Sequence, residues 1–76
     1  MKKSEFLREL ELLFDEKKGS LTEDRELKYI AKLDSMGMLD LLAFLTKDIG
    51  MKVDLDALYE AKTIRDIIVM TDGKVS

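Results

Sequence analysis

The sequence predicts an all-α fold, a small three- to four-helix bundle with a long loop between helices one and two. Apolar residues recur at spacings of three and four, which is typical of amphipathic helices. Capping residues and glycines mark where the helices should begin and end. The 76 residues include no cysteine, so a chain this small must depend on helix packing rather than disulfide bonds.

The first helix is expected to run from Ser4 to about Asp15, with Ser4 as its N-cap. Leu12 falls outside its apolar stripe, which consists of Phe6, Leu7, Leu10, Leu13 and Phe14. Gly19 is expected to end this helix, because glycine readily adopts the left-handed conformation found after helix C-termini.

A long ordered loop is expected from Ser20 to Leu33, with one helical turn near Asp24 to Tyr29. Loops of this length in small domains are uncommon unless they are functional or pinned by their own apolar residues. The polar sequence of this loop contains four such anchors: Leu21, Leu27, Ile30 and Leu33. We therefore expect the loop to pack against the helices.

The second helix should run from Ser35 to Ile49 and stop at Gly50, followed by a short helical segment from Asp54 to Glu60. A capping-box-like sequence begins the last helix at Thr63. The buried side of that helix is expected to contain Ile64, Ile67 and Ile68, and the pattern leaves the side of Val69 open. Residues 1–76 are expected to form one domain, with 1–3 and 72–76 flexible.

The second helix carries two apolar faces. Its core stripe is expected to consist of Met38, Leu41, Leu42, Leu45 and Ile49. Met36, Leu39 and Ala43 fall on the other side, beside Asp40 and Lys47. They could pack under the preceding loop or stay partly exposed to meet a partner, as apolar groups rimmed by charge often do. We favour partial exposure, since methionine tolerates varied partner shapes.

Ser35 lies where this helix begins. An Asp-Ser pair before an apolar helix is usually a plain N-cap. A phosphate ester on Ser35 would be well placed, because free backbone N–H groups and the helix dipole attract an anion. Asp34 would disfavour a second negative charge, so its presence needs a reason such as contact with a metal or an enzyme.

Several classes of function do not fit the composition. The chain has 16 acidic and 13 basic residues, and it lacks the basic stripe of a nucleic-acid binder. Without histidine or cysteine it cannot assemble a Ser-His or Cys-His nucleophile, so no catalytic residue is assigned. An EF-hand fails because Leu58 occupies a ligand position, and no metal site is predicted. A charged amphipathic start argues against a signal peptide or membrane insertion, and a cytoplasmic location is expected.

The stretch Leu33-Asp34-Ser35-Met36-Gly37 resembles the Asp-Ser-Leu motif of acyl carrier proteins, whose serine carries 4′-phosphopantetheine. The likeness covers nearly the whole chain. Residues 49–53 are similar to the family's turn after helix two, and residues 62–66 to its entry into helix four. The resemblance implies that Ser35 carries covalent 4′-phosphopantetheine from coenzyme A, and that Asp34 assists a phosphopantetheinyl transferase. It further implies a partner surface of Met36, Leu39, Asp40 and Ala43.

The resemblance implies a non-catalytic, monomeric carrier of thioesters in fatty-acid, specialised lipid or polyketide biosynthesis. Acyl-transfer, condensing or ligase enzymes would dock on helix two. Thr46 and Lys47 stand where fatty-acid carriers commonly have acidic residues, so this departure points to a specialised pathway as well as to the fatty-acid system. Three alternatives remain: a peptidyl or aminoacyl carrier, an arm-less interaction module in which Ser35 only caps the helix, and a dimer formed through the second apolar face.

Overall fold

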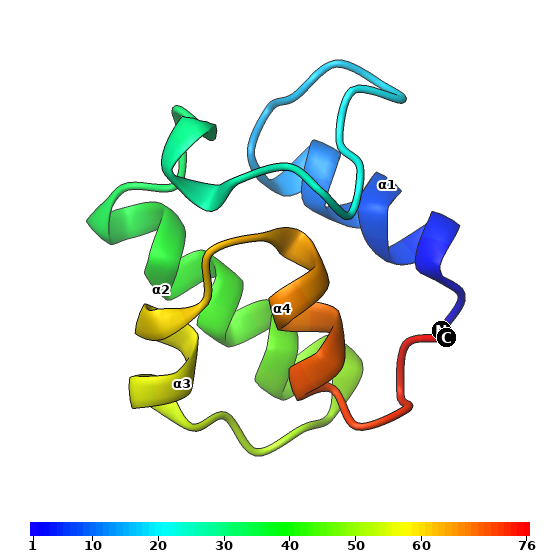
Figure 1. Ribbon diagram of the computed structural model, residues 1–76, viewed down its shortest axis with the longest axis vertical. Helices are drawn as coiled ribbons and strands as arrows, with labels where there is room; N and C mark the ends of the chain where they lie inside the picture. The colour runs from blue at the N-terminus through cyan, green and yellow to red at the C-terminus, as the bar shows by residue number, and fades with distance from the viewer.

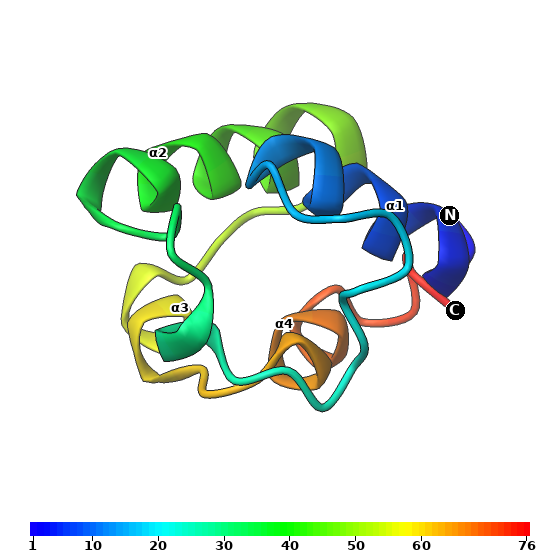
Figure 2. The ribbon, with the colours of Figure 1, turned by 90° about the horizontal axis from the view of Figure 1, so that it is seen from above.

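The computed structural model describes residues 1–76 and contains four α-helices, whose course is shown in Figure 1. Seen from above, α1 and α2 lie on one side of the bundle and α3 and α4 on the other (Figure 2). The helices are α1 (Lys3–Leu13), α2 (Ser35–Phe44), α3 (Leu55–Glu60) and α4 (Ile64–Met70). A 3₁₀ turn at Leu27–Tyr29 lies in the long loop, and a π-helical stretch at Leu45–Ile49 continues α2. The predicted all-α bundle is confirmed.

The residues that cap and terminate α1 differ from those predicted. Lys2 occupies the N-cap position and no side chain caps the helix, so the prediction of Ser4 as N-cap was wrong. The helix ends well before Gly19, because Asp15 adopts a left-handed conformation with φ of 55°. The Glu16 N–H donates to the Glu11 carbonyl at 2.8 Å, which closes a C-terminal motif that glycine usually makes. Aspartate is among the few residues other than glycine that enter this region.

The core lies between the two layers and joins all four helices. The rings of Phe6 and Phe44 pack with centroids 5.8 Å apart and planes inclined by 38°. Phe44 is buried although the helical wheel left it outside the core stripe of α2, because α1 supplies Phe6 as its partner. Val69, whose side the sequence left open, is 71% exposed on α4. The neighbouring isoleucines fill the inner side of that helix: Ile64, Ile67 and Ile68.

The predicted loop between α1 and α2 is ordered and attached to α1. The Glu11 carboxylate, only 3% exposed, accepts the Leu21 N–H at 3.0 Å and lies 3.5 Å from Arg8. Hydrogen bonds to the Leu21 and Gly19 N–H groups hold the pKa of Glu11 below its ordinary value, although burial opposes them. The loop's apolar anchors are buried or half-buried, as predicted: Leu21, Leu27, Ile30 and Leu33.

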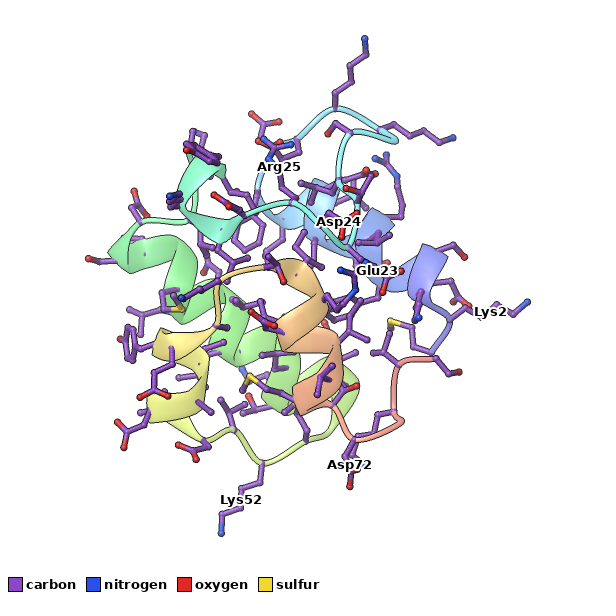
Figure 3. The ribbon with its side chains drawn as sticks, viewed as in Figure 1. Lys2, Glu23, Asp24, Arg25, Lys52 and Asp72 are labelled. Atoms are coloured by element: carbon purple, nitrogen blue, oxygen red, sulfur yellow. The ribbon has the colours of Figure 1, made fainter.

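The same loop is also attached to the start of α4. The Leu27 N–H donates to the Lys62 carbonyl at 2.8 Å, and the Arg65 guanidinium pairs with Asp24 at 2.6 Å. Figure 3 shows Glu23, Asp24 and Arg25 on the part of the loop that runs between α1 and α4. The loop is therefore held by contacts with α1 and with the start of α4, and these contacts fix the path by which it reaches α2.

The capping box predicted for the last helix is present. The Thr63 hydroxyl accepts the Asp66 N–H at 3.3 Å, and the Asp66 carboxylate accepts the N–H groups of Lys62 and Thr63 at 2.9 and 3.1 Å. These two donors lower the pKa of Asp66 from its ordinary value. None of the helices has the length and apolar character needed to cross a membrane.

The two ends of the chain lie side by side (Figures 1 and 2). The Lys3 N–H donates to the Ser76 carbonyl, and the Ser76 N–H to the Met1 carbonyl, both at 3.0 Å. Val75 is 4% exposed and belongs to the core. The flexibility expected for residues 1–3 and 72–76 stays a prediction, and these contacts favour ends that are held together.

Candidate functional site

Ser35 is the first residue of α2, and Asp34 is the residue that caps the helix. The Asp34 Oδ1 atom accepts the Gly37 N–H at 2.9 Å. The interpretation of Ser35 as a plain N-cap was therefore wrong, because the carboxylate one residue earlier fills that role. The Ser35 side chain is exposed, and its hydroxyl forms no hydrogen bond within the chain.

Two backbone donors remain free beside this hydroxyl. The Gly37 N–H is bound by the Asp34 side chain, and the Met38 N–H donates to the Asp34 carbonyl at 2.8 Å. The N–H groups of Ser35 and Met36 have no acceptor, since no helical turn precedes them. An anion joined to the Ser35 oxygen would meet these donors and the positive end of the helix dipole. The residues present therefore fit a phosphate ester at this position.

Gly37 is a site residue that sequence reasoning missed. It is buried in the first turn of α2, and a Cβ atom there would overlap the backbone carbonyl of Lys32. The end of the long loop thus lies directly against the helix that begins at Ser35. A glycine inside a helix costs about 1 kcal/mol relative to alanine, and that cost was the available signal.

The structure shows that the second apolar face of α2 is exposed. Met36 is 68% exposed and Leu39 58% exposed, and Ala43 and Asp40 are also open to solvent. These four side chains lie on one side of the helix, at spacings of three and four. The loop does not cover them, and the expected partial exposure is confirmed. We call Asp34, Met36, Leu39, Asp40 and Ala43 the α2 surface.

A shallow groove of about 490 Å³ contains Ser35. Its lining includes Met38 and Leu39 from α2 and Tyr59 from α3. Tyr59 is 68% exposed. The sequence placed Tyr59 on a short helical segment but gave no sign that this segment packs beside Ser35, because only the tertiary fold brings α3 there.

Comparison with known proteins identifies the family. A family model described as the phosphopantetheine attachment site matches residues 5–69, a stretch that includes Ser35 and the whole α2 surface. Searches of curated proteins and of solved structures gave no match. Members of the matched family are carrier domains, generally non-catalytic, that work with a phosphopantetheinyl transferase and with other enzymes. Since the match covers well over half of the 76 residues, the chain belongs to this family of carriers with covalently attached 4′-phosphopantetheine.

Proposed function

We propose that the Ser35 Oγ atom is the attachment point of the 4′-phosphopantetheine arm, and that the chain carries acyl intermediates as thioesters. One observation carries this proposal. The Ser35 hydroxyl is exposed and unbonded at the start of α2, because Asp34 caps the helix in its place. A serine that was only a cap would have its oxygen occupied by a backbone N–H.

Attachment requires a simple exchange of phosphorus–oxygen bonds. The Ser35 Oγ atom forms a bond to the pantetheine-side phosphorus of coenzyme A, and the pyrophosphate bond breaks. Adenosine 3′,5′-bisphosphate leaves with the bonding electrons, and the transferase accepts the hydroxyl proton. The resulting ester carries a negative charge beside the free N–H groups of Ser35 and Met36. When bound, the arm supplies a thiol, which this cysteine-free chain lacks, to hold the cargo.

The α2 surface is the proposed docking site for the transferase and for acyl-transfer, condensing or ligase enzymes. Met36 and Leu39 offer a small apolar patch, and the carboxylates of Asp34 and Asp40 lie beside it. Few charges and little apolar area favour weak, steered encounters, which suit a carrier that must leave each enzyme. We further propose that residues 1–76 act as one monomeric carrier domain in the cytoplasm.

The cargo class is the finer part of the proposal. Thr46 and Lys47 are exposed just beyond the α2 surface. Because fatty-acid carriers commonly have acidic residues there, this departure favours a dedicated lipid or polyketide pathway. A peptidyl or aminoacyl carrier would have the same attachment chemistry, so identifying the acyl group released from the thioester distinguishes these cargoes.

Intact-mass spectrometry tests the attachment site. We expect the chain to gain the mass of one arm after incubation with coenzyme A and a broad-specificity phosphopantetheinyl transferase. Ser35→Ala should gain none, whereas Ser4→Ala, which changes an exposed serine in the first turn of α1, should gain the full mass. Circular dichroism verifies that each variant is folded.

Two results would contradict the proposal. A mass increase that survives Ser35→Ala would place the arm elsewhere. The absence of any mass increase in the wild-type chain would favour an arm-less interaction module with the same fold.

A further inference from the structure

A second groove, of about 420 Å³, lies between α1 and α2, away from Ser35. Its walls come from the second half of α1 and from the end of α2 with its π-helical extension. Six lining residues matter for its chemistry: Glu9, Leu12, Asp40, Ala43, Lys47 and Asp48. The function proposed for Ser35 does not by itself account for the α1 side of this groove.

Leu12 is the apolar wall contributed by α1. It lies outside the core stripe of that helix and is 59% exposed. Ala43, across the groove on α2, is also open to solvent, while Phe44 beside it is 8% exposed and packs into the core. The groove therefore presents apolar surface that the fold itself does not use, as partner-binding surfaces often do.

The charged residues of the groove indicate the sign of its partner. Glu9, Asp40 and Asp48 are exposed, and none of their carboxylates lies within ion-pair distance of a cation. Lys47 is exposed and also unpaired, so three negative charges and one positive charge give a net charge of −2. By contrast, three carboxylates along the long loop are paired with arginines: Glu16, Glu23 and Asp24. Unpaired carboxylates around an apolar surface favour a basic partner.

The groove is continuous with the α2 surface, because Asp40 and Ala43 belong to both. Ala43 follows Ser35 by eight residues, which corresponds to about 12 Å along the helix axis. A partner seated in the groove would therefore leave Ser35 accessible and close by. Such a position suits an enzyme that acts on a group carried at Ser35.

We propose that a partner enzyme docks in this groove with an apolar side chain flanked by lysine or arginine residues. The apolar side chain packs between Leu12 and Ala43, and the cations face the carboxylates of Glu9, Asp40 and Asp48. A buried apolar anchor within a charged rim is the arrangement that concentrates binding energy in few contacts. This inference rests on the proposed carrier function, since it extends the docking surface from α2 onto α1 and makes Leu12 a specificity-determining contact.

An NMR titration of the ¹⁵N-labelled chain carrying its arm tests the groove. The probe is a synthetic helical peptide with leucines on one side and lysines flanking them; a control peptide has glutamates in place of the lysines. We expect amide shifts in residues 9–13 and 40–48 with the lysine peptide, weakening as salt is added, and none with the glutamate peptide. Leu12→Ser should bind the lysine peptide about tenfold more weakly.

Val69→Ser is the matched control, because Val69 is another exposed apolar residue, 71% exposed on α4 and outside the groove. Val69→Ser should bind the lysine peptide with the same affinity as the wild-type chain carrying its arm. Equal affinity of Leu12→Ser and Val69→Ser, shifts confined to residues 35–39, or equal binding of both peptides would overturn the inference. Shifts at the groove that grow with carrier concentration alone would assign it to a second copy of this chain instead.

The mass measurement on the wild-type chain distinguishes a failure of the carrier function from a failure of the groove assignment. If the arm attaches at Ser35 but the groove does not select the lysine peptide, only the groove assignment fails. If no arm attaches, the carrier function fails, and the same titration of the arm-free chain still decides the groove assignment.

Discussion

The carboxylate of Asp34 accepts the backbone N–H of Gly37 at 2.9 Å, and this bond leaves the neighbouring Ser35 hydroxyl free. A side-chain oxygen at a helix start can accept one of the unpaired N–H groups, and either residue of an Asp-Ser pair can supply it. Here Asp34 stabilises the helix and Ser35 presents its oxygen to solvent. Two adjacent residues therefore divide the structural task from the chemical task that we propose for Ser35.

Replacing Asp34 separates its capping role from recognition by the transferase. Asp34→Ala should lower the free energy of unfolding by about 1 kcal/mol, because the Gly37 N–H loses its acceptor. Asp34→Asn should retain nearly all of the stability, since asparagine caps equally well. Urea denaturation measures both. Both variants should attach the arm more slowly if the transferase binds the carboxylate, and a wild-type rate for Asp34→Asn would show that it does not.

Gly37→Ala should destabilise the chain even though alanine favours helix. The new Cβ atom would overlap the Lys32 carbonyl, and forcing the loop away should cost about 1–3 kcal/mol. Helix propensity alone would instead add about 1 kcal/mol of stability. The sign of the change in urea denaturation decides between these effects. Ala43→Gly, at an exposed position of the same helix, measures the propensity contribution separately.

Glu11 should make stability depend on pH in the acid range. Its pKa in the folded chain is lowered, mainly by the Leu21 N–H, so the unfolded chain binds the proton more tightly. This contribution is fully present above the unfolded pKa of about 4.3 and is lost as the pH falls through the folded pKa. Urea denaturation measures the free energy of unfolding at pH 7 and at about pH 3.5. Between these two values Glu11→Gln should lose less of that free energy than the wild-type chain does.

The control for this measurement is Glu5→Gln, because Glu5 is an exposed carboxylate in the first turn of the same helix. Its variant should keep the acid sensitivity of the unmodified chain. If Glu11→Gln loses as much stability on acidification as the wild-type chain does, the Glu11–Leu21 contact does not contribute the expected pH dependence.

The elements that the sequence predicted well begin with strong local signals. Thr63 and Asp66 form the predicted capping box because all its donors and acceptors lie within a few residues. The termination of α1 was wrongly assigned to Gly19, because Asp15 in a left-handed conformation has no distinctive sequence pattern. Gly19, the more obvious candidate, does have a positive φ, but it lies in the loop beyond.

The sequence predicted only those features of the site that depend on α2 alone. The exposure of Met36 and Leu39 follows from a helical wheel whose opposite face already supplies the core. Which residue caps α2 depends on whether Asp34 reaches Gly37, and the sequence leaves that choice open. Tyr59 and Leu12 come from α3 and α1, so their positions beside α2 require the tertiary fold.

The last four residues should contribute to stability rather than fray. Val75 is 4% exposed, and its N–H donates to the Thr71 hydroxyl at 3.3 Å. Val75→Ala should therefore lower the free energy of unfolding by about 1–2 kcal/mol, through lost apolar burial and the cavity that remains. Lys74→Ala, an exposed neighbour whose backbone carbonyl is retained, should change stability by less than about 0.5 kcal/mol.

Amide hydrogen exchange reports directly on whether the ends stay paired. The Lys3 and Ser76 N–H groups each donate to the opposite terminus at 3.0 Å, so both should exchange more slowly than the exposed Lys2 amide. Val75→Ala should speed their exchange, because Val75 anchors the segment that carries Ser76 to the core. Rapid exchange at both amides, together with an unchanged stability of Val75→Ala, would instead support the flexible ends that the sequence predicts. Slow exchange of the Lys3 and Ser76 amides would show that the two termini stay hydrogen-bonded to each other beside α1.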